Sequence, residues 1–236
     1  MDPEIAGPGP APLVFVADLT APALDDGDRH HLERALRLRS GDEVTASDGR
    51  GRWRPCQLRA GGELEPTGLP SVVPAPTPAL TVAFALTKGG RPELAVQKLT
   101  ELGVDRIVPF AAGRSVARWE GDRAERHLAR LRRVAREAAM QSRRAHLPTV
   151  AALTDFAGAA ALPGAALADR GGRPPSLAHP TLLVGPEGGW TSDELAAGLP
   201  VVGLGPQVLR AETAALAAAA LLAALRSNLL FGRGTA

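Results

Sequence analysis

The 236-residue chain is 45% hydrophobic and only 22% charged, which excludes an intrinsically disordered protein and predicts a sizeable folded core. Aromatic residues make up 3% and Tyr is absent, which argues against a single-strand nucleic-acid binder built on rows of stacked rings. The lone cysteine, Cys56, excludes an internal disulfide and a cysteine-based metal cluster. Because no signal-peptide pattern or membrane-length apolar run is present, we expect a cytoplasmic protein with no membrane partner.

The first 70 residues carry the pattern of a small β-barrel with one helix. Residues 28–39 have apolar side chains at helical spacing, and Ser40-Gly41 follows as a stop signal. A turn signal, Asp48-Gly49, separates two of the expected strands. The strands are expected at residues 13–16, 43–46, 51–54 and 57–58.

Five prolines between residues 66 and 78 indicate a linker, since proline stiffens the chain and blocks strand pairing. We therefore expect a first domain over residues 1–70 and a second over residues 78–236. In the second domain strand signals alternate with helix signals, which predicts a parallel α/β sheet. Its strands are expected at 80–86, 104–110, 149–150, 165–167, 182–184 and 201–202, and its helices at 92–102, 121–141, 211–226 and after a capping box at 191–194.

The expected helix at 121–141 lies in a strongly basic segment. Residues 114–144 contain ten arginines against four acidic residues, a net charge of +6, whereas the whole chain carries only +2. Such a local excess is typical of a surface that binds phosphates. The alternative is a solvated helix whose arginines pair with acidic neighbours, as Arg133 would with Glu137.

Two short apolar runs near the C-terminus end abruptly in glycine and proline, at residues 182–190 and 202–209. Each has the pattern of a buried parallel strand that opens into a loop before a helix. Loops at the carboxyl ends of parallel strands usually bind the ligand, and glycine lets the backbone approach it closely. The two loops together predict one pocket, although each taken singly is also compatible with a simple tight turn.

The familiar phosphate, metal and hydrolase motifs are missing. There is no P-loop pattern, and Gly203-x-Gly205 lacks the third glycine of a dinucleotide fingerprint. No H-E-x-x-H pattern or cysteine cluster occurs, so we predict no metal site. A G-x-S-x-G elbow is absent as well, although a dispersed Ser-His-Asp triad stays open.

Four ordered motifs occupy much of the second half of the chain. They are K-G-x-R…Q-K-x-T-E-L-G-V…R-S from Lys88 to Ser115, E-A-A-x-Q-S-x-R at 137–144, V-G-P-E-G-G-W-T-x-x-E-L at 184–195 and L-G-x-x-x-L-R-x-E-T-A at 204–214. Together they resemble the SPOUT superfamily of RNA methyltransferases, and more narrowly the family that methylates N3 of a uridine in small-subunit ribosomal RNA. The stretch H-H-L-x-R-x-L-R-L-x-x-G-D-E-V at 30–44 resembles that family's N-terminal PUA-like domain.

The resemblance implies an α/β fold, with a SPOUT-type parallel sheet and a C-terminal trefoil knot preceded by a small PUA-like β-barrel. Knots are rare among proteins and no periodicity in the sequence indicates one, so the knot rests on the resemblance alone. The resemblance also implies S-adenosylmethionine as methyl donor and a homodimer. The implied substrate is 16S ribosomal RNA, in the small ribosomal subunit or its precursor.

The resemblance further implies which residues bind and react. Arg210 is the candidate cation that stabilises the uracil anion, or else a phosphate clamp. Glu187 and Glu212 are candidate bases or orienting groups, although a carboxylate at a helix start, such as Glu212, is also explained by the helix dipole. The implied cofactor-binding residues are Leu167, Val184, Gly185, Glu187, Gly188, Gly189, Leu204, Gly205 and Leu209. From the resemblance and from the basic segment together, the expected RNA-binding residues are Arg34, Arg37, Arg39, Arg114, Arg118, Arg126, Arg130 and Arg143.

The sequence departs from the family pattern at two places. Gln207 stands where the family pattern has a basic residue, and the extreme N-terminus offers Asp2 and Glu4 where basic residues are expected. Two alternatives stay open beside uridine-N3 methylation. One is a SPOUT methyltransferase that acts on tRNA or on a ribose 2'-hydroxyl, and the other is a non-catalytic RNA-binding factor in ribosome assembly.

Overall fold

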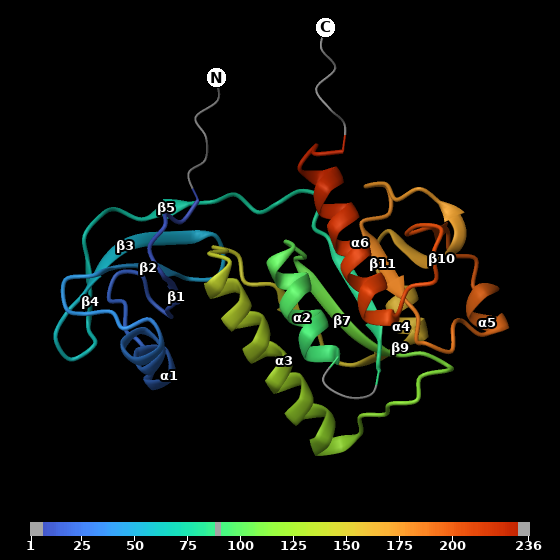
Figure 1. Cartoon of the computed structure of the whole chain (residues 1–236), viewed down its shortest axis with the longest axis horizontal. Helices are drawn as coiled ribbons and strands as arrows, with labels where there is room; N and C mark the ends of the chain where they lie inside the picture. Colours follow the sequence, from blue (N-terminus) through green and yellow to red (C-terminus); the bar gives the residue numbers. More distant parts are fainter. Residues whose placement is uncertain (1–6, 88–90, 231–236) are drawn as a thin grey trace, which may run out of the picture. The chain divides into compact units, whose positions relative to one another are not determined.

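The computed structural model describes residues 7–87 and 91–230 (Figure 1). The chain forms two compact units, one of residues up to Ala75 together with Ala139–Leu147, the other of Pro76–Ala138 together with the residues from Pro148 onward. Within the described ranges no helix is both long enough and apolar enough to cross a membrane. Lys88, Gly89 and Gly90 of the K-G-x-R motif, like Asp2 and Glu4, lie outside the described residues.

The first unit contains a five-stranded sheet. Pairing between β1 and β2 is parallel, whereas β3 pairs antiparallel with β2, β4 and β5. The expected strands at 51–54 and 57–58 form one strand, β3, that runs through Pro55. Pro55 has no N–H to donate, but it lies one residue beyond the β3–β4 ladder, which pairs Cys56 with Pro66, and its carbonyl accepts from the amide of Thr67. The strand bounds are β1 Leu13–Phe15, β2 Glu43–Ser47, β3 Arg52–Leu58, β4 Leu64–Pro66 and β5 Ser71–Val72.

The helix of the first unit ends earlier than expected. The α-helix α1 (Asp26–His30) continues into a wider π turn, η1 (His31–Ala35), and does not reach residue 39. Arg37 has a left-handed backbone with φ of 56°, and the amide of Leu38 donates to the carbonyl of Leu32 at 3.0 Å. The prediction of a helix to Arg39 was therefore wrong, because the apolar spacing continues past the point where the backbone reverses.

Residues 139–147 complete the first unit, although they follow the arginine-rich helix in sequence. Ala139 and Met140 are buried among the apolar side chains of the five-stranded sheet. The carbonyl of Ala145 accepts hydrogen bonds from the amide of Gly51 at 3.0 Å and from the hydroxyl of Ser47 at 3.1 Å. The first unit is thus built from two separate stretches of chain.

The second unit contains a seven-stranded sheet in which every pair is parallel, as predicted. The strand order is β12-β10-β11-β6-β7-β8, and β9 also pairs with β7. β11 and β12 follow each other in the sequence but are not neighbours in the sheet, because β10 lies between them. The bounds are β6 Thr81–Ala85, β7 Arg106–Ala111, β8 Thr149–Val150, β9 Thr154–Asp155, β10 Ala165–Arg173, β11 Thr181–Val184 and β12 Val201–Val202.

Helices cover both faces of this sheet (Figure 1). In β6, Val82 and Phe84 point to one face and pack with α2, α3 and α6, while Ala83 and Ala85 point to the other face, which α4 covers. The predicted bounds of α3 and α6 are confirmed, whereas the short β9 and α4 were not expected. The helices are α2 Arg91–Glu101, α3 Gly121–Gln141, α4 Phe156–Ala160, α5 Ser192–Leu195 and α6 Ala211–Arg226.

Candidate active site

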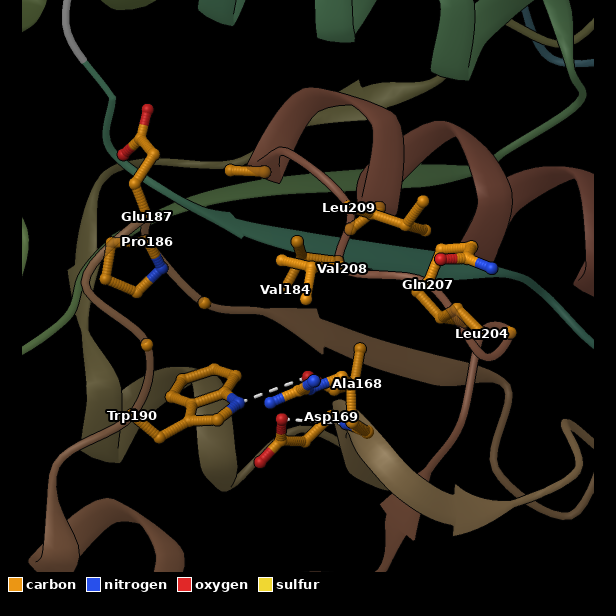
Figure 2. Close-up of a pocket in the computed structure, with 16 residues that line it drawn as sticks. Ala168, Asp169, Val184, Pro186, Glu187, Trp190, Leu204, Gln207, Val208 and Leu209 are labelled. Atoms are coloured by element: carbon orange, nitrogen blue, oxygen red, sulfur yellow. Dashed lines mark hydrogen bonds between the residues drawn. The ribbon is translucent and has the colours of Figure 1, made fainter.

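A cavity lies at the carboxyl ends of β11 and β12, beside the middle of β10 (Figure 2). Its wall combines the middle of β10, the loop after β11, the loop after β12 and the first turn of α6. The structure therefore brings the two glycine-bearing loops together at one cavity. The lining residues are Ala168, Asp169, Arg170, Val184, Gly185, Pro186, Glu187, Gly189, Trp190, Leu204, Gly205, Gln207, Val208, Leu209, Ala211 and Ala214.

The inner wall of the cavity is apolar. Ala168 and Val184 are register partners across β10 and β11, and both point to the face of the sheet that α6 covers. Leu204 and Leu209 add aliphatic side chains from the loop after β12. An apolar wall beside exposed loop backbone suits a flat heterocycle, whose faces are covered by side chains while its edge hydrogen-bonds to peptide groups.

Trp190 holds the loop after β11 against the end of β10. Its indole Nε1 donates to the carbonyl of Ala168 at 3.1 Å. Its ring stacks on Phe110, with 6.2 Å between centroids, and meets Phe156 edge-on at 5.9 Å. A Cβ added to Gly185 would lie 3.0 Å from Cε2 of Trp190, so glycine is needed for this close approach. The sequence pattern contained Trp190 but gave no indication of this role.

Two of the loop glycines have backbone conformations that other residues rarely adopt. Gly189 has φ of 70° and donates its amide to the carbonyl of Pro186 at 2.8 Å, which closes the turn after β11. Gly205, in the loop after β12, has φ of 140°. These two positions explain why the pattern places glycine in both loops.

Most of the expected cofactor-binding residues line the cavity, but Leu167 and Gly188 do not. Leu167 is fully buried and points to the α4 face, because side chains alternate along β10, and its neighbour Ala168 faces the cavity instead. Gly188 presents its carbonyl to the guanidinium of Arg114, whose Nη1 donates at 3.0 Å. The residues that do line it are Val184, Gly185, Glu187, Gly189, Leu204, Gly205 and Leu209.

The three expected catalytic residues lie in or beside the cavity wall. Glu187 lines the cavity and is exposed. Arg210 is the exposed N-cap residue of α6, between the lining residues Leu209 and Ala211, but is not itself a lining residue. Glu212 lies in the first turn of α6, half-buried and outside the lining.

Two charged lining residues were not predicted. Asp169 and Arg170 extend β10 beyond the expected strand at 165–167, and the Oδ1 atom of Asp169 accepts from the amide of Arg170 at 2.7 Å. A polar pair directly after a buried parallel strand was the available signal, since ligand sites gather at that edge of a sheet. Gln207 and Val208 complete the rim, and Val208 is 76% exposed.

The expected RNA-binding arginines are all exposed and are divided between the two units. In the second unit, Nε of Arg130 lies 3.0 Å from Oε1 of Glu93, so this arginine is paired. Arg114 reaches the loop after β11, as described above. The first unit carries Arg34, Arg37, Arg39 and Arg143, and the second carries Arg114, Arg118, Arg126 and Arg130.

Comparison with known proteins matches both parts of the chain. Residues 74–223 match the RNA methyltransferase domain family, and residues 24–65 match the RNA methyltransferase PUA domain family. The ribosomal RNA small subunit methyltransferase E of Mycobacterium tuberculosis is 37% identical, over 89% of this chain and 89% of that protein. The protein of the same name from Bacillus subtilis is 28% identical, over 79% of this chain and 83% of its own length.

Solved structures agree with this match. A probable rRNA-methyltransferase from Porphyromonas gingivalis superposes with a TM-score of 0.77 at 28% identity, over 92% of this chain and 99% of that chain. A ribosomal RNA small subunit methyltransferase E from Neisseria gonorrhoeae, bound to S-adenosyl methionine, gives a TM-score of 0.75 at 29% identity, over 91% and 98%. The predicted fold class, a SPOUT-like parallel α/β sheet after a PUA-like domain, is thereby confirmed. The chain belongs to the ribosomal RNA small subunit methyltransferase E family.

Proposed function

We propose that this protein transfers the methyl group of S-adenosylmethionine to N3 of a uridine in 16S ribosomal RNA. The observation that carries the proposal is that the two glycine-bearing loops, at the carboxyl ends of β11 and β12, together form one cavity beside β10. This is the edge of a parallel sheet where ligands usually bind. The relative from Neisseria gonorrhoeae, which shares the fold over nearly its whole length, is bound to S-adenosyl methionine.

The chemistry of the cavity fits this cofactor. Val184, Leu204 and Leu209 would cover the adenine ring, and the peptide groups of the loop after β12 would bind its edge. Asp169 and Glu187 bring two negative charges to the lining against the single positive charge of Arg170. That excess complements a ligand with a sulfonium and an ammonium but only one carboxylate. When bound, S-adenosylmethionine supplies an electrophilic methyl group.

The acceptor nitrogen must lose a proton, because N3 of uracil is a weak acid that is protonated at neutral pH. Arg210 donates N–H groups to a uracil carbonyl oxygen and stabilises the anion there. Glu187, on the cavity wall, accepts the N3 proton or orients the base, and Glu212 supports Arg210 from the first turn of α6. The role assigned to Arg210 is supported by its position, since it lies between two residues that line the cavity.

The RNA is held by the exposed arginines of both units. Arg34, Arg37 and Arg39 bind phosphates from the PUA-like domain, and Arg118, Arg126 and Arg130 do so from the second unit. The segment 114–144 around these last three carries a net charge of +6, against +2 for the whole chain. Arg143 of the first unit and Arg114 of the second unit are further candidate contacts.

We infer further features of the assembly from family membership. The PUA-like domain is assigned to residues 1–70 and the methyltransferase domain to residues 78–236, in keeping with the family matches at 24–65 and 74–223. The crossover that places β10 between β11 and β12 is compatible with a C-terminal trefoil knot. The protein acts as a cytoplasmic homodimer on the small ribosomal subunit or its precursor.

The test is methyl transfer to small ribosomal subunits from a strain that lacks the gene. The purified protein should add one methyl group to 16S RNA, and mass spectrometry of nuclease digests should locate it on N3 of a single uridine. A ribose-methylated nucleotide, or transfer only to tRNA, would instead support one of the other SPOUT activities. Calorimetry that detects RNA binding but no S-adenosylmethionine binding would support a non-catalytic assembly factor.

A further inference from the structure

A buried carboxylate connects two loops that follow non-adjacent strands. Glu194, in the short helix α5, is only 5% exposed. Its Oε2 accepts from the amide of Thr191 at 2.8 Å, and its Oε1 accepts from the amide of Gly113 at 2.8 Å. Gly113 follows β7, whereas Thr191 ends the loop after β11, and β6 lies between these two strands in the sheet. Glu194 therefore joins the loop after β7 to the loop that lines the cavity.

The helix cap alone does not account for the bond to Gly113. The capping box of α5 needs only the reciprocal bonds between Thr191 and Glu194, and both are present. The second oxygen of Glu194 is used for a residue 81 positions away. The approach is close, since a Cβ on Gly113 would lie 2.8 Å from Cγ2 of Thr191. The two loops are packed together as well as hydrogen-bonded.

The residue after Gly113 makes a second contact with the same loop. Arg114 is exposed, and its Nη1 donates to the carbonyl of Gly188 at 3.0 Å. A Cβ on Gly188 would lie 3.2 Å from Cβ of Arg114, so backbone and side chain are closely apposed. Ser115 closes this turn, because its hydroxyl accepts from the amide of Ala112 at 3.1 Å. The turn of residues 112–115 thus supports the cavity loop at both Gly188 and Thr191.

We propose that Glu194 is a positioning residue that joins the Gly113-Arg114 turn to the cofactor loop, so that RNA contact at Arg114 and cofactor binding depend on each other. The inference rests on the proposed function. An RNA phosphate at Arg114 fixes the Gly188 carbonyl through the same guanidinium, and an ordered cofactor loop fixes Arg114 for the phosphate. Because coupling between two ligands is reciprocal, each ligand then raises the affinity for the other.

Glu194→Gln tests the inference with little change in shape. The amide keeps one acceptor oxygen but presents an NH₂ group to the second backbone N–H, so one of the two bonds is lost. We expect the KM for S-adenosylmethionine and the KM for RNA each to rise about tenfold, with kcat nearly unchanged. Asp193→Asn is the matched control, because Asp193 is an exposed acid on the same helix, and it should leave both KM values unchanged.

Gly113→Ala examines the same contact without altering Glu194, should Glu194→Gln fold poorly. Its methyl group would push the turn away from Thr191 and should raise the same two KM values. Arg114→Ala should weaken RNA binding, and adding Glu194→Gln to it should weaken RNA binding little further, since Glu194 acts on RNA through Arg114. Fully additive effects in the double variant would contradict the inference.

Calorimetry on the whole protein separates the two proposals. The wild type should bind S-adenosylmethionine more tightly in the presence of the RNA, and Glu194→Gln should lose that enhancement. A merely structural role would lower Tm or the active fraction and leave the enhancement intact, which would overturn the positioning role. Wild-type protein that binds no S-adenosylmethionine at all would instead overturn the proposed function.

Discussion

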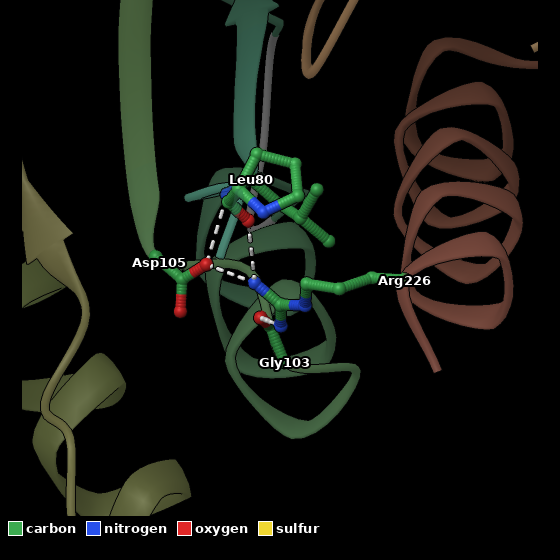
Figure 3. Close-up of polar contacts among 5 residues, drawn as sticks. Leu80, Gly103, Asp105 and Arg226 are labelled. Atoms are coloured by element: carbon green, nitrogen blue, oxygen red, sulfur yellow. Dashed lines mark hydrogen bonds and ion pairs between the residues drawn. The ribbon is translucent and has the colours of Figure 1, made fainter. Parts of the chain in front are cut away.

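Asp105 and Arg226 form an ion pair that ties the C-terminal end of α6 to the start of β7 (Figure 3). Their side chains are 17% and 13% exposed, so water screens the pair little. Nη2 of Arg226 also donates to the carbonyl of Gly103 at 2.8 Å, and Oδ2 of Asp105 accepts from the amide of Leu80 at 2.8 Å. The other end of α6 lines the cavity, so this pair anchors a helix whose first turn belongs to the active site.

Removing one partner of this pair should destabilise the protein. Arg226→Ala leaves the carboxylate of Asp105 with fewer donors in a mostly buried position, and we expect the free energy of unfolding to fall by about 3 kcal/mol. Urea unfolding followed by circular dichroism measures the change. Arg133→Ala, at an exposed position on α3, is the control and should change it by less than about 0.5 kcal/mol. Equal effects of the two variants would argue against the anchoring role.

Gly185→Ala should disturb the cavity through Trp190. The new methyl group would lie about 3.0 Å from the indole ring, so the ring must shift and its bond to the carbonyl of Ala168 must lengthen. Calorimetry should show S-adenosylmethionine binding weakened about tenfold or more. Gly9→Ala has no neighbour within 4 Å of the added Cβ and should bind the cofactor like the wild type. Unchanged affinity in Gly185→Ala would show that the loop tolerates the displacement.

Arg210→Ala should abolish methylation while leaving cofactor binding nearly intact. The guanidinium is assigned to the uracil anion, and loss of one such electrostatic group typically lowers kcat by about 100-fold or more. Single-turnover assays with ribosomal subunits measure the rate, and calorimetry measures cofactor affinity. Loss of both properties together would mean that Arg210 shapes the cofactor site and would contradict its assigned role.

The arginines of α3 should contribute to the salt dependence of RNA binding. Arg126→Ala should reduce the slope of log affinity against log salt by about 0.7 to 0.9 if one phosphate contact is lost. Arg130→Ala should weaken binding further, because it also leaves the carboxylate of Glu93 without its ion-pair partner next to the RNA. Filter binding across a salt series measures both slopes. If the slope is unchanged in a variant that combines Arg126→Ala and Arg130→Ala, this helix does not contact RNA.

Cys56 should react slowly with thiol reagents in the folded protein. It is 1% exposed, and burial raises the pKa of its thiol above the usual value, so the reactive thiolate is scarce at neutral pH. Labelling with a maleimide should be slow in buffer and fast in denaturant. Because the folded-state pKa is raised, the native labelling rate should keep increasing to a higher pH than that of the unfolded chain. Fast native labelling at pH 7 would mean that the first unit opens locally.

Long and strongly patterned elements could be predicted from the sequence. The bounds of α3 agree with the expectation because its apolar stripe of Leu128, Leu131, Ala135 and Ala138 repeats over about three turns and is buried. By contrast, α4 has five residues, among them Gly158, and β9 has two, which is too short for any periodicity to appear. The joining of residues 139–147 to the first unit depends on tertiary contacts and was also beyond the sequence pattern.

The two loops of the candidate site could be predicted, but not every side chain that faces the cavity. Leu167 was expected there and Ala168 is found instead, a difference of one residue that reverses the face of a strand. Ala165, Ala166 and Leu167 are all apolar, so no alternation of apolar and polar residues indicates which side chains face the cavity. The contact between Glu194 and Gly113 joins residues 81 positions apart, and local patterns do not report such pairs.

The central claim is that a methyl donor binds between the loop after β11 and the loop after β12. A crystal structure of the protein with S-adenosylhomocysteine tests it most directly. The account predicts the nucleoside in the cavity, with the adenine ring against Val184 and Leu209 and the Gly185 and Gly205 backbones close to the ligand. Ligand density at another place, or a cavity still filled by its own loops at saturating ligand, would contradict it.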